Sequence, residues 1–503
     1  MVSFGSFMVY TRRKMKIVRQ EIKRTVHFIG IGGIGTSALA RWFLSQKWGV
    51  SGSDLSSSQI TAKLRKEGIR VFIGHKAQNL PKEAKLVVFS AAIQPDNPEL
   101  VKARQKGIPC QTYAQTLGDL TKKYKTIAIA GAHGKGTSTA LLSLVLIKSG
   151  FDPTVIIGTN LKEFGNKNFR KGRGPHLLIE ADEYQRHFLH HSPIAALITN
   201  IDKEHLDFFK NLNDIKNTFL KFIGNIQPSG ILVVNKDDKN LYSLKNKIQK
   251  IAEKNQLKVY WYSICPRKSA LSLRLSAMMK IPGDHNISNA LGVYTLAKVL
   301  GTKNKDIFLA LSRYRGAWRR MEHRGELKTK NLKLKTKIYD DYAHHPTEIK
   351  ATLSGFRKKY PDKKIICVFQ PHQAKRLKAL FREFTTAFDL ADILVLLDIY
   401  KVPGRDTSTR LSASKVSQNV NSAKLARATE KRLNALKPLK NRKKSASKGR
   451  ISLKRVIYLP LSPRVINGLK LTLRDLLFDQ RKSAIIVMMG AGDIYKMTDK
   501  LIK

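Results

Sequence analysis

The sequence predicts an α/β protein with mostly parallel sheets, divided into three domains. Strand-like apolar runs alternate with helical patterns along most of the 503 residues, the order expected when helices connect parallel strands. At about 150 residues per domain, this length also corresponds to roughly three domains. We therefore expect a basic N-terminal extension and three domains, over residues 1–24, 25–124, 125–317 and 318–503.

The composition predicts ordinary globular cores. Apolar residues make up 42% of the chain. Since no apolar run approaches the ~20 residues of a membrane-spanning helix, we expect no membrane insertion. Cys110, Cys265 and Cys367 are far apart and lack metal-ligand spacing, which favours free thiols in a reducing cytoplasm.

The net charge of +56 is unusually high. It indicates either attraction to nucleic acid or anionic substrates, or simply a surface of solvated lysines. We favour the second interpretation, because no aromatic-rich RNA-binding pattern or zinc-finger spacing accompanies the charge. Nucleic acid is therefore expected only as a nonspecific partner. Residues 420–453 are especially basic and poor in strand formers, which predicts an exposed, flexible insertion.

The first expected domain opens with a strand, a glycine-rich turn and a helix. Gly30, Gly32 and Gly35 have G-x-G-x-x-G spacing, which lets a diphosphate approach the backbone at a helix N-terminus. Asp54 ends the next strand, where an acidic side chain can bind a ribose hydroxyl. This motif alone fits a nicotinamide dehydrogenase, another diphosphate-binding protein or an unliganded turn. The expected strands are residues 25–31, 48–54, 68–74 and 85–90.

The second expected domain carries a different phosphate loop, GAHGKGTST, between an apolar strand and a helical segment. Gly131, Gly134 and Gly136 permit a wrapped backbone, and Lys135 can reach terminal phosphates. The expected strands are residues 125–131, 176–182, 195–202 and 230–238.

Acidic and histidine side chains follow two of these strands. Glu180 and His205 each come just after an apolar run, so they are expected to converge at one sheet edge. A carboxylate and an imidazole there suit magnesium bridging between a nucleotide and a substrate. The histidines of HFLHH, over residues 187–191, are interpreted as surface or packing residues.

The third expected domain has strands at residues 336–346, 363–372, 391–400, 454–461 and 483–493. The complete pattern argues against a dehydrogenase, because phosphate-binding turns occur in two separate domains. One turn would hold a nucleotide-linked substrate, and the other would hold the ATP that activates it.

Ten motifs in order resemble the Mur ligase family, from about Thr25 to Ile502 with residues 420–453 unmatched. They are HFIGIGGIG, SAAIQPDNPE, GAHGKGTST, EADEYQRHFL, TNIDKEHLDFF, GDHNISNALG, WRRME, DDYAHHPTEIKATL, VFQPH and MGAGDIY. The resemblance implies a Rossmann-like UDP-binding domain, a central P-loop ATPase domain with a mostly parallel sheet, and a Rossmann-like C-terminal domain. It also implies ATP-dependent joining of L-alanine to the lactyl carboxylate of UDP-N-acetylmuramate, with ATP and two Mg²⁺ ions, by a cytoplasmic monomer or homodimer.

The resemblance also implies site residues. The UDP-sugar would be bound by Gly32, Gly33, Gly35, Asp54 and Ser90. ATP would be bound by Gly131, Ala132, His133, Gly134, Lys135, Gly136, Thr137, His285, Asn289, Arg320 and Asp341. The amino acid would be bound by His344, His372 and Arg376, and the metal by Thr137, Glu180 and His205. The residues expected to carry catalysis are Lys135, Glu180, His205, Arg320 and His344.

Four features depart from the family pattern. Gly136 stands where a hydroxyl residue commonly holds magnesium, Glu204 where an Asp precedes the metal histidine, and Gln373 where an arginine reads the amino-acid carboxylate. We expect Thr137 and Arg376 to take over the first and third roles. The basic insertion is the fourth departure.

Three other functions are alternatives to the alanine-adding ligase. They are a family member that adds a tripeptide to the same UDP-sugar, a nicotinamide dehydrogenase, and a nucleic-acid-binding protein that retains only the fold.

Overall fold

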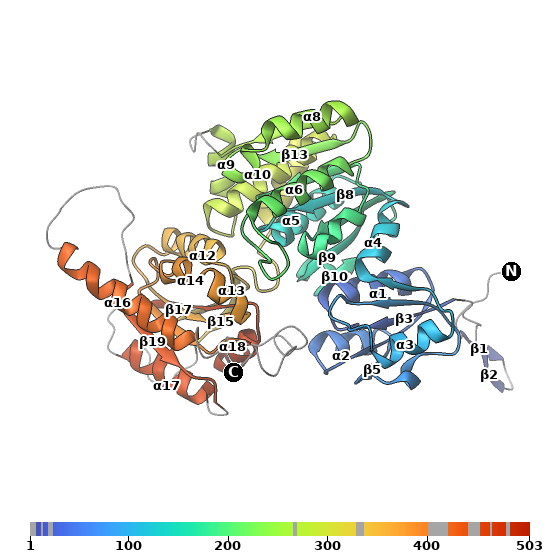
Figure 1. Cartoon of the computed structure of the whole chain (residues 1–503), viewed down its shortest axis with the longest axis horizontal. Helices are drawn as coiled ribbons and strands as arrows, with labels where there is room; N and C mark the ends of the chain where they lie inside the picture. The colour runs from blue at the N-terminus through green and yellow to red at the C-terminus, as the bar shows by residue number, and fades with distance from the viewer. Residues whose placement is uncertain are drawn as a thin grey trace.

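The protein folds into three α/β domains, each built around its own sheet (Figure 1). The structure is a computed structural model that describes residues 7–11, 14–18, 24–264, 269–327, 336–400, 421–440, 453–462, 465–478 and 483–502. The central domain lies between the other two at the top of the view in Figure 1. Among the described helices, none has the length and apolar character needed to cross a membrane. The expected α/β class with three mostly parallel sheets is confirmed.

The first sheet places its glycine-rich turn at the point where the strand order reverses. Its strands are β5 (Arg70–Ile73), β4 (Gly49–Asp54), β3 (Thr25–Ile29), β6 (Ala84–Phe89) and β7 (Cys110–Thr112), in that spatial order and all parallel. Helix α1 (Ile34–Ser45) follows the turn, and the other helices are α2 (Gln59–Lys66), α3 (Pro98–Gln105) and α4 (Tyr113–Thr121). Because β4 and β6 flank β3 on opposite sides, the turn after β3 opens into the crevice that parallel sheets use for ligands.

The central sheet surrounds the second phosphate loop. Its order is β10 (Lys167–Arg170), β9 (Thr154–Leu161), β11 (His176–Ala181), β8 (Lys125–Ala130), β12 (Ala195–Ile198), β13 (Ile231–Asn235) and β14 (Lys258–Tyr262), with only β10 antiparallel. Helix α5 (Lys135–Lys148) leaves the loop and packs against α10 (Asp284–Val299) and α11 (Asn304–Arg313). Since α5 is buried along most of its length, its apolar residues surround it instead of forming one stripe.

The third sheet again has one antiparallel edge strand. Its order is β15 (Glu322–Glu326), β16 (Lys337–Asp341), β20 (Ala484–Met489), β17 (Lys364–Phe369), β18 (Ile393–Leu397) and β19 (Arg455–Leu459). Helix α12 (Pro346–Lys359) follows β16, and α13 (Ala374–Ala379) follows β17. Both helices therefore begin at the carboxyl edge of the sheet, which faces the central domain.

The basic segment predicted as an exposed insertion contains a packed helix, α16 (Ser422–Lys440). Leu425, Thr429 and Leu433 recur every four residues and are all buried, and the helix contacts β19 and α14 (Phe381–Thr385). The loop expectation is therefore wrong for the start of this segment, because the charges obscured a helical apolar stripe. Residues 441–452 lie outside the described residues.

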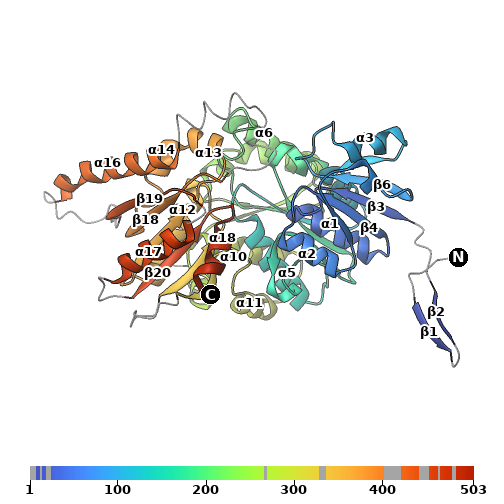
Figure 2. The same ribbon diagram turned by 90° about the horizontal axis from the view of Figure 1, so that it is seen from below.

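At the other end of the chain, β1 (Phe7–Thr11) and β2 (Lys14–Val18) form an antiparallel hairpin within the expected N-terminal extension. The hairpin lies apart from the three domains (Figure 2). Cys110 and Cys367 are free thiols, as expected, whereas Cys265 lies outside the described residues.

Candidate active site

A cavity of about 740 Å³ lies where the three domains meet. It brings together residues that are far apart in the sequence. Its lining includes Gly32, Gly33, Gly35 and Ser90 of the first domain, Lys135, Glu180 and His205 of the second, and Arg320, His344, His372 and Arg376 of the third.

The first glycine turn is held by close packing. The backbone N–H of Gly32 donates to Asp54 Oδ2 at 2.8 Å. A Cβ atom at Gly32 would lie 2.8 Å from that oxygen, and one at Gly35 would lie 2.8 Å from the Tyr113 ring. Both positions therefore need glycine. Asp54, singled out from the sequence as a ribose ligand, orders the turn with one of its carboxylate oxygens.

The second loop wraps tightly before α5. Gly131 and Gly134 have φ of 135° and 84°, in the region that favours glycine. A Cβ atom at Gly131 would lie 2.1 Å from Thr199 Oγ1, and one at Gly134 would lie 2.6 Å from Asn289 Oδ1. The loop is therefore locked between the end of β12 and helix α10.

Lys135 is the first residue of α5, and its ammonium group closes the loop. Nζ donates to the carbonyl of Gly131 at 2.7 Å and pairs with Glu183 Oε2 at 2.7 Å. Burial alone would lower the pKa of Lys135, but the charges of Glu183 and Asp182 raise it above its usual range. The side chain thus presents a fixed positive charge beside the loop amides, which is the arrangement that binds terminal phosphates.

Gly136 leaves space between the loop and the acidic strand end. A Cβ atom there would lie 3.2 Å from Glu180 Oε1 and 3.8 Å from Arg320 Nη2. Glu180 Oε1 accepts a hydrogen bond of 2.7 Å from the Gly158 N–H, and burial raises the pKa of this carboxyl group. Thr137, one residue further along, is buried and lines a second pocket next to the cleft.

A group of potential metal ligands includes two acids that lie two and three residues along the chain from Glu180. His205 was expected among the ligands from the sequence, whereas Asp182 and Glu183 were not. Asp182, Glu183 and His205 offer ligand atoms that lie within 4.8 Å of one another. Glu183 Oε1 is buried, has no hydrogen-bond partner among the described residues, and lies 3.6 Å from His205 Nε2. Two carboxylates and an imidazole are ligands that suit a divalent cation, and the buried Glu183 Oε1 has no hydrogen bond from the described residues that would compete with one. The signal was present in EADEY, where one acid near the end of β11 is followed by two more directly after the strand.

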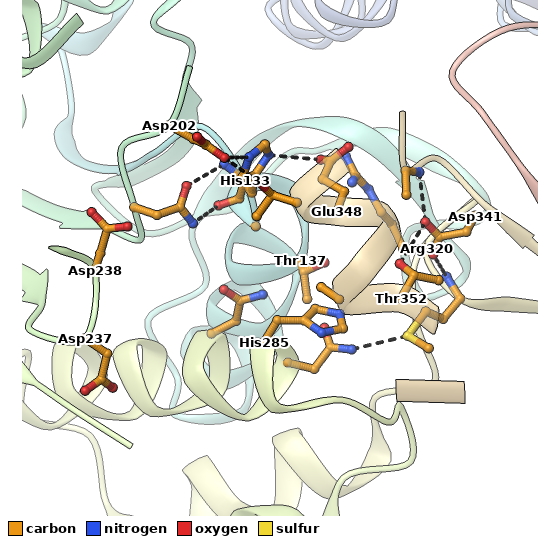
Figure 3. Close-up of a pocket in the computed structure, with 18 of the residues that line it drawn as sticks. His133, Thr137, Asp202, Asp237, Asp238, His285, Arg320, Asp341, Glu348 and Thr352 are labelled. Carbon is orange, nitrogen blue, oxygen red and sulfur yellow. Dashed lines mark hydrogen bonds and ion pairs between the residues drawn. The ribbon is translucent and has the colours of Figure 1, made fainter. Parts of the chain in front are cut away.

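A second pocket of about 420 Å³ adjoins the cleft and shares His133, Gly134, Arg320 and Glu348 with it. Figure 3 shows how its side chains from the central and third domains face one another. His285 and Asn289 come from α10, and burial lowers the pKa of His285 to about 4, so its ring is neutral at pH 7. This pocket holds the residues expected near adenine.

Arg320 and Asp341 enter the same pocket from the third domain. Asp341 Oδ2 accepts from the Met321 N–H at 2.8 Å, and burial raises the pKa of Asp341 to about 6. Asp341 therefore fixes the backbone beside Arg320.

His133 links the central and third domains. Its Nε2 lies 2.9 Å from Asp202 Oδ2, and its Nδ1 lies 3.3 Å from Glu348 Oε1, on α12 (Figure 3). Burial would lower the pKa of His133, but hydrogen bonds to Asp202 and Glu348 outweigh burial and raise it to about 10. Thr347 Oγ1 also donates to Asp202 at 2.7 Å. The sequence interpretation did not single out Glu348, because nothing in PTEIK marks it as buried.

The residues expected to bind the amino-acid substrate also lie close together. The rings of His344 and His372 lie 5.8 Å apart, and burial together with Arg376 lowers the pKa of His344 to about 4. Arg376 Nη2 pairs with the buried Glu204 Oε2 at 3.1 Å. Glu204, one of the departures noted above, is thus the central-domain partner of Arg376.

Comparisons with known proteins agree with this architecture. Family models match residues 25–125 (Mur ligase family, catalytic domain), 129–297 (Mur ligase middle domain) and 319–445 (Mur ligase, glutamate ligase domain). A UDP-N-acetylmuramate–L-alanine ligase of Clostridium botulinum is 42% identical over 402 residues, covering 76% of this chain and 84% of that protein. The enzyme of the same name from Acetivibrio thermocellus is 36% identical and covers 95% of both chains.

Among solved structures, the UDP-N-acetylmuramate–alanine ligase of Thermotoga maritima matches with a TM-score of 0.68 and 26% identity, over 95% of this chain and 98% of that one. The fold and the two phosphate loops define an ATP-dependent ligase of three domains. The chain belongs to the Mur ligase family, whose members use ATP.

Proposed function

We propose that the chain joins L-alanine to the lactyl carboxylate of UDP-N-acetylmuramate, using ATP, in the cytoplasmic synthesis of peptidoglycan precursors for cell-wall growth, cell shape and division. The names of the relatives at 36–42% identity support this activity. The observation that carries the proposal is the meeting of both glycine loops in one cleft. A UDP-sugar on the first loop and ATP on the second would direct their reactive ends toward each other.

The reaction needs activation because a carboxylate has no leaving group that an amine can displace. The lactyl carboxylate oxygen attacks the γ-phosphorus of ATP, ADP leaves, and an acyl phosphate forms. The neutral amine of L-alanine then attacks the acyl carbon, and the tetrahedral intermediate expels phosphate. One proton leaves the nitrogen as the amide forms.

Both partners of the first step are anionic, so the site must offset their repulsion. Lys135 and Arg320 supply fixed positive charge from two domains, and positioning in the closed cleft supplies much of the remaining acceleration. Mg²⁺ would be held by His205 with Asp182 and Glu183, whose ligand atoms lie within 4.8 Å of one another. Glu180 would join them from the same cleft, Thr137 would supply a hydroxyl group from the adjoining pocket, and a second ion would complete the site. Bound Mg²⁺ neutralises charge that develops on the phosphate oxygens.

The second step uses the third domain. Neutral His344 and nearby His372 can hydrogen-bond to the incoming amino acid without repelling it. Arg376 can attract its carboxylate while Glu204 fixes the guanidinium group.

Oxygen-isotope transfer tests this chemistry. UDP-N-acetylmuramate carrying ¹⁸O in its lactyl carboxylate should pass one labelled oxygen to inorganic phosphate in each turnover, since the acyl C–O bond breaks. Mass spectrometry of the phosphate measures the transfer. Unlabelled phosphate formed together with the amide product would rule out the acyl phosphate.

A further inference from the structure

A third cavity, separate from the cleft and the nucleotide pocket, is strongly basic. It has a volume of about 510 Å³ and receives side chains from all three domains beside the linker that enters β15. Six cationic side chains line it: Lys63, Lys162, Lys280, Arg315, Lys337 and Lys359. Glu322 is the one carboxylate among the lining residues.

This charge is not a uniform property of the protein's concave surfaces. The pocket of about 420 Å³ is lined by five carboxylates, Asp202, Asp237, Asp238, Asp341 and Glu348, and by three cationic side chains, Lys239, Arg320 and the protonated His133. A concave site with walls of one sign concentrates the field that attracts oppositely charged ligands. The basic cavity therefore has an electrostatic character that the proposed reaction does not require.

Most of the cations in this cavity are not neutralised by any acidic group that the structure describes. Within the described ranges, Lys162, Lys280, Arg315 and Lys337 take part in no ion pair. The Glu322 carboxylate is used locally, since it accepts from the Arg319 N–H at 3.0 Å.

Two further lysines in the cavity are held by backbone carbonyl groups. Lys63 Nζ donates to the Asn166 carbonyl and Lys359 Nζ to the Lys280 carbonyl, each at 3.3 Å. Such bonds orient an ammonium group while leaving its charge uncompensated.

His323 shows that these charges converge inside one space. Burial lowers the pKa of His323, and the charges of Lys337, Lys359 and Lys162 lower it further, opposed by Glu326. The His323 ring lies 5.1 Å from the ring of Tyr339, whose hydroxyl group lies 2.5 Å from that of Tyr360. The cavity thus combines several ammonium groups with a hydroxyl-bearing aromatic wall.

We propose that this cavity binds a small anion carrying several phosphate groups. Ammonium and guanidinium groups with unsatisfied charge are the usual partners of phosphate oxygens. A volume of about 510 Å³ bounded by side chains of three domains suits a compact ligand better than a nucleic-acid strand, which needs an extended groove. Trp318 borders both this cavity and the catalytic cleft, and its backbone N–H donates to the Asn160 carbonyl at 3.0 Å. The bound anion therefore lies next to the interface between the central and third domains.

Calorimetric titration with inorganic tripolyphosphate tests the proposal. The full-length chain with Lys135→Ala is used throughout, in 150 mM salt without magnesium, so that the phosphate loop does not compete. A Lys280→Gln/Lys337→Gln pair removes two cavity charges. A Lys247→Gln/Lys250→Gln pair on α8 (Lys245–Asn255) removes two exposed charges far from it. Thermal unfolding checks that both variants fold.

The expected result is stoichiometric binding that weakens at least tenfold in the cavity pair and less than twofold in the α8 pair. Equal weakening in both pairs, or no measurable binding, would overturn the proposal. A single-stranded oligonucleotide is titrated in parallel. If the oligonucleotide alone bound, with its affinity lost only in the cavity pair, the small-anion assignment would be wrong and the surface would be a nucleic-acid site.

Discussion

Lys135 is the residue on which ATP use depends most directly. Its ammonium group lies against the loop carbonyls and Glu183, beside the first turn of α5. We predict that Lys135→Ala lowers kcat/KM at least a hundredfold, about 3 kcal/mol, because a preorganised contact to the transferring phosphoryl group is lost. UDP-sugar affinity should stay within twofold, since that ligand uses the first domain. Lys148→Ala, at the exposed end of α5, is the matched control, and normal turnover in Lys135→Ala would refute the assignment.

The raised pKa of His133 should make the free energy of unfolding depend on pH. Its pKa is raised from the ordinary 6.5 to about 10 by Asp202 and Glu348, against the opposing effect of burial. The charged form is therefore stabilised by folding, so its contribution is complete below pH 6.5 and is lost as the pH rises toward 10. Between these values, the free energy of unfolding should fall by about 2 kcal/mol more in the wild type than in His133→Gln, as expected for hydrogen bonds to a charged group.

Urea denaturation at several pH values measures this difference. His190→Gln, at an exposed histidine, serves as the control and should follow the wild type. Parallel curves for the wild type and His133→Gln would show that His133 is not held between the two carboxylates.

At the residue scale, sequence patterns could locate the loops but not every partner. Lys135, Asn289 and Arg320 stand in motifs whose spacing indicates chemistry, and they meet at the two pockets. Glu183 and Glu348 were not singled out, because the contacts that make them important, Glu183 with Lys135 and Glu348 with His133, join segments far apart in the sequence. The salt bridge from Arg376 to Glu204 could not be predicted either, since it joins two distant segments.

At the scale of elements, the packing of α16 shows whether the basic segment is part of the third domain. Leu425 is fully buried in the core shared with the sheet. Leu425→Ala should lower the free energy of unfolding by about 3 kcal/mol, the usual cost of truncating a buried leucine. Lys431→Ala, on the exposed face of α16, should change it by less than about 0.5 kcal/mol. Chemical denaturation measures both, and equal small effects would indicate that α16 does not pack.

The strands were the elements most accessible from sequence. Continuous apolar runs predicted the buried parallel strands β3, β8 and β20, since a strand covered on both faces has no polar side. The antiparallel edges were harder to predict. β15, with sequence EHRGE, has no apolar run, and its antiparallel pairing with β16 contains a register shift between His323 and Gly325.

At the scale of the whole molecule, contacts such as His133 to Glu348 and Arg376 to Glu204 join the central and third domains around the cleft where the three domains meet. Nucleotide should therefore favour the closed arrangement of the domains. We predict that a non-hydrolysable ATP analogue together with UDP-N-acetylmuramate reduces the radius of gyration in small-angle scattering, relative to the unliganded protein. An unchanged radius would exclude closure as a step of the reaction.

The three-domain plan followed from chain length and the alternation of strands and helices, but the cavities did not. The catalytic cleft and the basic cavity each combine side chains from three domains. Their composition depends on how the domains pack, which local patterns do not encode. For this reason the +56 charge, interpreted from sequence as solvated lysines, could not be assigned to any cavity in advance.

Phosphate release from ATP is the measurement that tests the central claim most directly. With UDP-N-acetylmuramate present, L-alanine should give one phosphate for each amide formed. The tripeptide should give none, and neither should omission of the UDP-sugar. Faster release with the tripeptide than with alanine would assign the chain to the tripeptide-adding branch of the family. No release under any condition, from folded protein with magnesium, would contradict the ligase account altogether.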